Sequence, residues 1–409
     1  MLALAAVAIA QRPPAHKLLV ISIDGLDARF FSDPALRVKA PNIRRLMRDG
    51  ASATVVGVAP SETWPAHASM MTGVSPWQNG ITAPDLPASP GDRFFAAATL
   101  RTPALWDLAT RAGMKVATVN WPSTLGADVA FDFPAYWQTL QGNAVPFDAM
   151  AQKSTPPGIA DRVEKAFPSF EKQVWDDSSS ANAATFLLAN ERPDLVLVHM
   201  SEVEEEQRET TARSIYARDT LETDDDLIGQ MLAKMAPGTI VVLVSDHGFE
   251  NDNRVVRPRV LLREAGIKGR VEVADGLIGT ADPAVAAHLK GLIGQGRKSG
   301  LAREVPMSEV RAKAPALGRW IAAFDTLPDY VASDEERGPA VGPGTHLGVS
   351  GFWPNRPGYR SVFVIAGDGV RAVKLGEIDM LQIAPTLAEA LGIKLPVAKS
   401  SSLWHSVSR

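Results

Sequence analysis

The sequence predicts an α/β fold with a doubly wound, mostly parallel central sheet. Two observations support this prediction: short, wholly apolar runs recur along the chain, and stretches of helical character separate them. An apolar run without polar alternation is typical of a strand that is buried on both faces, as the strands of parallel sheets are. The chain has 409 residues, 45% of them hydrophobic, which is enough for one large core with a smaller insert.

Five apolar runs predict buried parallel strands. They span residues 18–24, 116–121, 195–200, 239–246 and 361–367. Helices are expected between and after them, at residues 41–49, 65–71, 105–112, 181–190, 210–234 and 380–391. Ligands of such sheets bind at the carboxyl ends of the strands, so we expect the chemistry of this protein to gather there.

Two regions interrupt the alternation of strand and helix. The interruption at about 122–175 is rich in proline and aromatic residues and predicts a cap, and residues 252–344 predict an inserted αβ subdomain. The core then comprises residues 17–251 and 345–396. Residues 1–10 are apolar, end in a small-x-small pattern and resemble the remnant of a signal peptide, which predicts a periplasmic or secreted protein. A frayed terminal tail is the alternative.

Charge and composition exclude several classes of function. The net charge of -4 and the pI near 6.0 leave no broad basic surface, so we expect no binding of nucleic-acid duplexes. No apolar run is long enough to span a membrane. Cysteine is absent, which excludes disulfides and thiolate metal sites. Any metal must therefore be held by carboxylate, imidazole or hydroxyl groups.

Acidic and histidine side chains end two of the predicted strands. Asp24 ends the first strand, and Asp246 and His247 follow a wholly apolar strand. Carboxylate and imidazole groups are suitable ligands for Zn²⁺, so these three residues predict a metal site. A turn or helix cap formed by the same residues is the alternative.

Thr63 lies at the start of a predicted helix that has a proline in its first turn. Its hydroxyl would face the positive end of the helix dipole, which suits a nucleophile that attacks phosphate, although a simple helix cap is the alternative. His346, in a glycine-rich loop, is a further candidate ligand, or else a loop histidine bonded to the backbone. His67 and His199 are expected to lie in the core or behind the site.

Taken in order, the motifs ISIDGL, SETWPAHASMMTG, VATVNWP, VLVSDHGF, GTHLG and IAPTLAEALGI, with an acidic segment after LVLVHM, resemble the nucleotide pyrophosphatase/phosphodiesterase family. This family belongs to the alkaline phosphatase superfamily, and the resemblance covers residues 17–396. It implies an alkaline phosphatase-like fold and a two-zinc site, in which Asp24, Asp246, His247 and the nucleophile Thr63 hold one zinc. It also implies that Trp64 stacks on the base of the substrate.

The second zinc site of the family is altered in this sequence. Its aspartate falls on Glu204 and its histidine on Arg208, and a guanidinium cannot bind a metal. The asparagine that helps to hold phosphate in the family falls on Pro84, which has no donor. We therefore expect one tightly bound metal, Zn²⁺ or alternatively Mn²⁺, and a weak or empty second site at Glu204 and His346.

These residues together predict a metal-dependent hydrolase of small phosphodiester, nucleotide pyrophosphate or phosphomonoester substrates. Thr63 would form a phospho-threonine intermediate, with Arg208 stabilising the charge on the phosphoryl oxygens. Two alternatives remain open at this stage. The chain is a non-catalytic or single-metal relative, or it hydrolyses sulfate or phosphonate esters. The sequence does not determine the oligomeric state.

Overall fold

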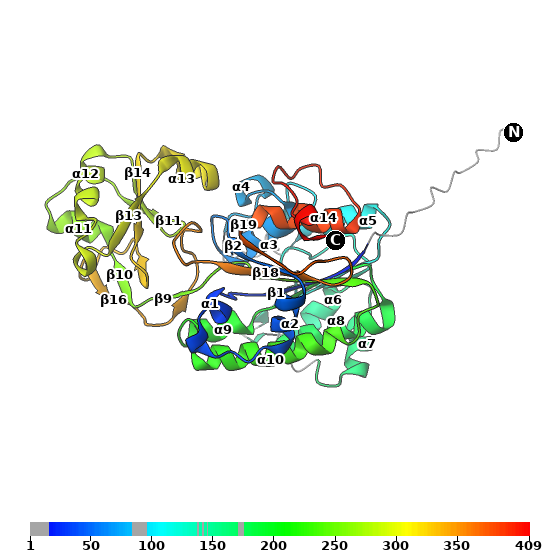
Figure 1. Cartoon of the computed structure of the whole chain (residues 1–409). Coiled ribbons are helices and arrows are strands. Elements are labelled where there is room, and N and C mark those ends of the chain that lie inside the picture. Colours follow the sequence, from blue (N-terminus) through cyan, green and yellow to red (C-terminus); the bar gives the residue numbers. More distant parts are fainter. Residues whose placement is uncertain (1–15, 84–95, 137–138, 141–142, 145, 171–175) are drawn as a thin grey trace.

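An eight-stranded sheet forms the centre of the molecule (Figure 1). The computed structural model describes residues 16–83, 96–136, 139–140, 143–144, 146–170 and 176–409. In spatial order the strands are β19 (Val373–Asp379), β2 (Ala51–Val56), β18 (Ser361–Ala366), β8 (Thr239–Val244), β1 (Lys17–Ile23), β7 (Leu195–Met200), β3 (Val116–Val119) and β4 (Phe131–Phe133).

The two faces of the sheet carry separate apolar cores. In β1, Leu19, Ile21 and Ile23 pack on one face, with helices such as α2 (Pro41–Asp49), α8 (Asp177–Phe186) and α10 (Ile215–Leu232). Leu18 and Val20 pack on the other face, with α3 (Thr63–Thr72), α5 (Leu105–Arg111) and α14 (Ile383–Leu391). Figure 1 shows these two layers of helices above and below the sheet. Burial on both faces explains why the strands read as continuous apolar runs.

The helices lie close to their predicted positions. The main ones are α2 (Pro41–Asp49), α3 (Thr63–Thr72), α5 (Leu105–Arg111), α6 (Pro146–Lys153), α7 (Ile159–Ala166), α8 (Asp177–Phe186), α9 (Glu202–Glu209), α10 (Ile215–Leu232) and α14 (Ile383–Leu391). The helix predicted at 210–234 is shorter at both ends, and α9 precedes it. The backbone leaves the helical conformation at Thr210 (φ −119°, ψ −106°), which separates the two helices.

The predicted mostly parallel sheet is confirmed, with one correction. β18 was expected to be parallel, but it pairs antiparallel with both β2 and β8. Its sequence is as apolar as that of a parallel strand because β18 lies inside the sheet, where helices cover both faces. An apolar composition indicates that a strand is buried, but it does not indicate whether the strand is parallel or antiparallel to its neighbours.

The two interrupting regions contribute to the fold in different ways. Within 122–175, β4 joins the edge of the central sheet, and α6 and α7 follow it. Residues 252–344 form two further sheets, which Figure 1 shows beside the core. Their strands are β10 (Arg254–Val256), β11 (Glu272–Ala274), β12 (Leu277–Thr280), β13 (Leu301–Val305), β14 (Ala322–Thr326), β15 (Tyr330–Ala332) and β16 (Val341–Pro343). The exact domain boundaries given above remain a prediction.

A short antiparallel pair connects this inserted region to the core. β9 (Glu250–Asn251) leads out of the core and β17 (Gly348–Val349) leads back, and the two strands are paired directly. Among the described residues, none of the helices is both long and apolar enough to cross a membrane. Residues 1–10, interpreted above as a signal-peptide remnant, lie outside the described part of the chain.

A buried carboxyl group lies at the edge strand β4. Asp132 is 1% exposed, and its Oδ1 accepts hydrogen bonds from the hydroxyls of Thr118 (2.7 Å) and Thr124 (3.0 Å). Burial raises the pKa of Asp132 to about 7, although both hydrogen bonds favour the charged form. The folded protein therefore retains a proton on Asp132 in a pH range where the unfolded chain has lost it.

Because the pKa of Asp132 differs between the folded and the unfolded protein, the free energy of unfolding should depend on pH. Because the folded pKa lies above the unfolded value, the contribution of Asp132 is complete below about pH 4 and is lost as the pH rises through about 7. The variant Asp132→Asn should become progressively more stable relative to the unmodified protein over this range, as measured by urea unfolding. The exposed Asp128→Asn should show no such trend, and a trend equal in both variants would contradict the assignment.

Candidate active site

The carboxyl ends of three adjacent strands bring the predicted ligands together. β1 pairs in parallel with both β7 and β8, with Ile23 opposite Met200 and Ser22 opposite Val244. Asp24 therefore follows β1 at the level where Asp246 and His247 follow β8. Helix α9 begins two residues after β7 and carries Glu204 to the same edge.

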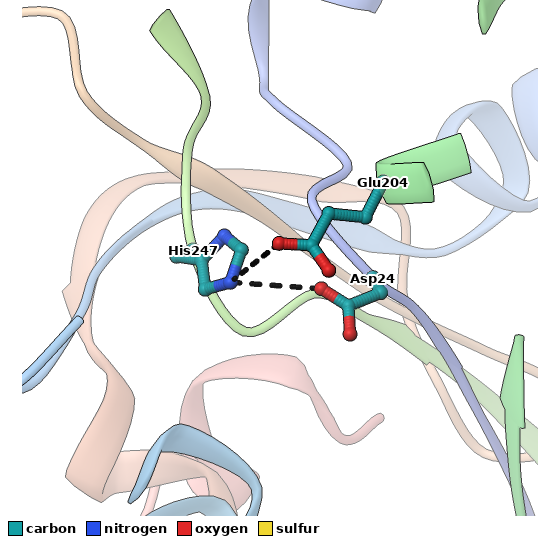
Figure 2. A group of neighbouring side chains, drawn as sticks. All are labelled: Asp24, Glu204 and His247. Carbon is teal, nitrogen blue, oxygen red and sulfur yellow. Dashed lines mark ion pairs between the residues drawn. The ribbon is translucent and has the colours of Figure 1, made fainter. Parts of the chain in front are cut away.

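His247 lies among three carboxylates. Its Nε2 is 3.2 Å from Asp246 Oδ2, 3.5 Å from Asp24 Oδ1 and 3.7 Å from Glu204 Oε1. Figure 2 shows the imidazole facing Asp24 and Glu204. Ligand atoms of Asp24, Glu204 and His247 all lie within 4.8 Å of one another, and all three side chains are buried. The predicted group of Asp24, Asp246 and His247 thus gains Glu204 as a close neighbour.

The hydrogen bonds of His247 determine which nitrogen carries the proton. Nδ1 lies 3.2 Å from the carbonyl oxygen of Gly248, which can only accept, so Nδ1 carries a proton and Nε2 is the nitrogen that faces the carboxylates. Within the described part of the chain, Nε2, Asp24 Oδ1 and Asp246 Oδ2 are buried atoms without a hydrogen-bond partner. An imidazole nitrogen and carboxylate oxygens that converge in this way are suitable ligands for a cation, so these residues fit a metal ion.

The two aspartates differ in their electrostatic surroundings. Burial, reinforced by Asp246 and Glu204, raises the pKa of Asp24 well above its ordinary value. Burial acts in the same direction on Asp246, but His247 and His67 outweigh it and hold the pKa of Asp246 below its ordinary value. Without a metal, the site therefore favours a charged Asp246 and a protonated Asp24.

His199 and His67 support the ligands from behind, as predicted. His199 donates from Nδ1 to the carbonyl oxygen of Asn120 (3.1 Å), and its Nε2 lies 3.1 Å from Asp24 Oδ2. Burial, together with the nearby His67, lowers the pKa of His199 to about 3, so its ring is neutral. The proton between His199 and Asp24 then resides on Asp24 in the metal-free protein, which agrees with the raised pKa of Asp24.

Thr63 is the first residue of α3 and is half-buried. His67 connects this helix end to the site, because its Nδ1 donates to the carbonyl oxygen of Thr63 (2.8 Å) and lies 3.8 Å from Asp246 Oδ2. Trp64 is only 9% exposed and packs in an apolar cluster that includes Leu125 and Tyr136. Any stacking of its indole on a base is limited to that exposed edge.

Arg208 reaches the site from the next turn of α9. Its Nη2 donates to Glu204 Oε1 (2.6 Å) and to the hydroxyl of Ser350 (2.8 Å). Burial acts to lower the pKa of the guanidinium, but Glu204 raises it above its ordinary value, so Arg208 is a permanent cation. Ser350 also donates to Glu62, the residue before Thr63 (3.2 Å). The sequence predicted no role for Glu62, although it lies in the motif around Thr63, or for Ser350, which follows the motif GTHLG.

The structure does not bring His346 to this group. Its side chain is exposed, with Nδ1 3.5 Å from Asn253 Oδ1, and its backbone N–H donates to Asp252. Its backbone is in the left-handed region (φ 65°), within the connection to the inserted region. Pro84, where the family has its phosphate-binding asparagine, lies outside the described residues.

The sheet, its two helical layers and the buried group at the strand ends together define an alkaline phosphatase-like α/β protein with a site suited to a metal ion. The family model for type I phosphodiesterase / nucleotide pyrophosphatase matches residues 18–338, and the chain belongs to this family. It is a hydrolase acting on phosphoric ester bonds, in a family that is metal-dependent.

Solved structures of ectonucleotide pyrophosphatase / phosphodiesterase 5 share the fold. The murine protein has a TM-score of 0.61 and 18% identity, and the human protein has a TM-score of 0.62 and 16% identity. A murine threonine-to-alanine variant, described as inactive and in complex with AMP, has a TM-score of 0.61 and 16% identity. Each match covers 96% of this chain and 100% of the other. No curated protein sequence matches the chain.

The opposite pKa shifts of the two aspartates predict opposite effects on stability. At neutral pH and without metal, Asp24→Asn should stabilise the fold, because the unmodified protein must take up a proton on Asp24 when it folds and the neutral amide avoids this cost. Asp246→Asn should destabilise it, because the folded protein favours that charge. Both variants should lose the stabilisation that Zn²⁺ gives to the unmodified protein. Guanidinium unfolding with EDTA or Zn²⁺ measures all three effects, and equal signs for the two variants would refute the assignment.

Proposed function

We propose that this chain hydrolyses phosphodiester or nucleotide pyrophosphate bonds through a phospho-threonine at Thr63, with a metal ion, Zn²⁺, held by Asp24, Asp246 and His247. One observation carries the proposal: three buried ligand atoms of these residues converge without hydrogen-bond partners in the described structure. The nucleophile lies at the start of α3, which His67 connects to Asp246.

The proposed reaction has two displacements. The Thr63 hydroxyl oxygen forms a bond to phosphorus as it loses its proton, and the bond from phosphorus to the leaving oxygen breaks. Water then attacks phosphorus, the bond to Thr63 breaks, and the threonine hydroxyl regains a proton. A bound Zn²⁺, or Mn²⁺ in its place, supplies positive charge that lowers the pKa of a coordinated hydroxyl.

Arg208 would stabilise the negative charge that develops on the phosphoryl oxygens. Its side chain is 44% exposed, so a substrate can reach it, and its fixed charge and planar donors match an oxyanion. Ser350 and Glu204 hold the guanidinium in place through the hydrogen bonds described above. The murine variant described as inactive lacks a threonine and is in complex with AMP, which supports a threonine nucleophile and a nucleotide substrate here.

Replacing the proposed nucleophile tests this mechanism. Thr63→Ala should reduce hydrolysis of bis(p-nitrophenyl) phosphate by at least about a thousandfold, because it removes the attacking oxygen. Circular dichroism and unfolding should be unchanged, since only one hydroxyl is lost. Thr63→Ser keeps a hydroxyl and should retain measurable turnover. Full activity of Thr63→Ala would show that another group attacks phosphorus.

We further propose that the chain binds one metal tightly, with a weak second site. Arg208 donates to Glu204 at 2.6 Å, so a permanent cation already neutralises the carboxylate that a second metal would use. Arg208→His should raise the metal content from about one toward two per chain, measured by elemental analysis. Arg208→Lys keeps the positive charge and should stay near one. Two stoichiometric metals in the unmodified protein would overturn this proposal.

The pair of Arg208 and Glu204 bears on which ester the chain prefers. A guanidinium in place of a second metal matches a phosphoryl or a sulfuryl oxygen. Assays of p-nitrophenyl phosphate, p-nitrophenyl sulfate, bis(p-nitrophenyl) phosphate and a nucleotide with Zn²⁺ or Mn²⁺ measure the preference. We expect the highest turnover for the diester or the nucleotide, and turnover of none of the phosphate esters would contradict the proposed function.

We also propose that the protein acts in the periplasm or outside the cell. The apolar residues 2–10, which end in a small-x-small pattern, support this location. Fractionation of cells that express the full chain, followed by immunoblotting, tests it.

A further inference from the structure

A second group of carboxylates lies behind the proposed active site. Asp177, Glu202 and Asp224 come from the three helices α8, α9 and α10, and one carboxylate oxygen of each lies within 4.8 Å of the others. Asp177 and Asp224 are fully buried, while Glu202 is half-buried. Glu202 belongs to the same helix as Glu204 but precedes it by two residues, which places the two side chains on different sides of α9.

Two of these carboxylates cap helices reciprocally. Asp177 accepts hydrogen bonds from the backbone N–H groups of Ser201 (2.6 Å) and Glu202 (3.0 Å), at the start of α9. Glu202 Oε2 accepts from the backbone N–H of Asp177 (2.9 Å), at the start of α8. These contacts account for the presence of Asp177 and Glu202, because helix N-termini need acceptors for their free N–H groups.

The helix-capping hydrogen bonds do not account for the presence of Asp224. Both of its carboxylate oxygens are buried and, within the described part of the chain, neither accepts a hydrogen bond from a backbone N–H or from a side-chain group other than a carboxyl. Its side chain points into the group, and the charged groups that act on it are Asp177 and Glu202, both acidic. A buried carboxylate beside two others is costly unless a cation or a proton compensates it. A purely structural cap would not need a third carboxylate here.

We propose that Asp177, Glu202 and Asp224 form a second metal site, which binds a hard divalent cation, Ca²⁺ in preference to Mg²⁺. The donors are all oxygens, which suits these ions and not the softer metals that prefer nitrogen or sulfur. Ca²⁺ binds oxygen at about 2.3–2.6 Å and so accommodates ligand oxygens up to about 5 Å apart, whereas Mg²⁺ requires a tighter, octahedral arrangement. The half-buried Glu202 gives the ion a path from solvent.

A cation here would stabilise the active site indirectly. Asp177 holds the backbone of Ser201 and Glu202, and the first turn of α9 contains Glu204, which lies beside His247. The ion would join the N-terminal ends of α8 and α9 to the middle of α10. The three carboxylates are thus positioning residues, because they act on the site through the placement of α9.

Thermal unfolding of the full chain, after removal of metals with a chelator, tests the proposal. Ca²⁺ should raise the melting temperature by roughly 3 °C when free Ca²⁺ exceeds the dissociation constant about a hundredfold. Asp224→Asn keeps the shape of the side chain but removes its charge, and should weaken Ca²⁺ binding at least tenfold. Asp226→Asn makes the same change at an exposed position of α10 and should keep the full Ca²⁺ effect.

Further measurements separate this site from the proposed active site. The Ca²⁺ effect should persist in Asp246→Asn, in which the active-site ligand group is broken, so a failure of the proposed function would not affect this result. Should Asp224→Asn fail to fold, Glu202→Gln tests the same site at its half-buried ligand. No Ca²⁺ effect on the unmodified protein, or an equal effect in Asp224→Asn and Asp226→Asn, would overturn the proposal in favour of a shared proton. Equal stabilisation by Mg²⁺ would overturn the preference for Ca²⁺.

Discussion

The parallel pairing of β1 with β7 and β8 is the constraint on which the site depends. It fixes the ends of three strands at one level, and the residues that follow them must then share a small buried volume. Asp24, Asp246 and His247 are forced together by this geometry rather than by attraction between them. Each remaining feature of the site, from His199 behind Asp24 to α9 beside it, is placed by the same edge of the sheet.

The group of Asp24, Asp246 and His247 has an unfavourable electrostatic energy that a bound cation can relieve. Burial disfavours the charge of Asp24, while His247 and His67 stabilise the charge of Asp246, so one carboxylate is ready to bind and the other must first lose a proton. A site of this kind lowers the free energy of unfolding of the empty protein, and binding of the ligand raises it again. The large cores on both faces of the sheet make this loss tolerable.

The sequence predicted the layers of the fold and the residues at the strand ends, because burial and strand endings leave a clear local pattern. It missed the strands β2, β4 and β19, which are short or only partly apolar, and it assigned the wrong direction to β18. It could not place His346, because a loop position depends on the backbone path of the inserted region. Glu62 and Ser350 are distant in sequence, and only the folded chain shows that they meet.

The paired strands β9 and β17 have a consequence for how the chain folds. The core needs β18 beside β8, yet the inserted residues separate these strands in the sequence. If the insert folds on its own, its pairing brings Asn251 and Gly348 together, and the entropy of closing a long loop falls to that of a short one. The insert then assists assembly of the sheet, because it holds β9 and β17 together. Another module whose ends lie equally close could take its place in the course of evolution.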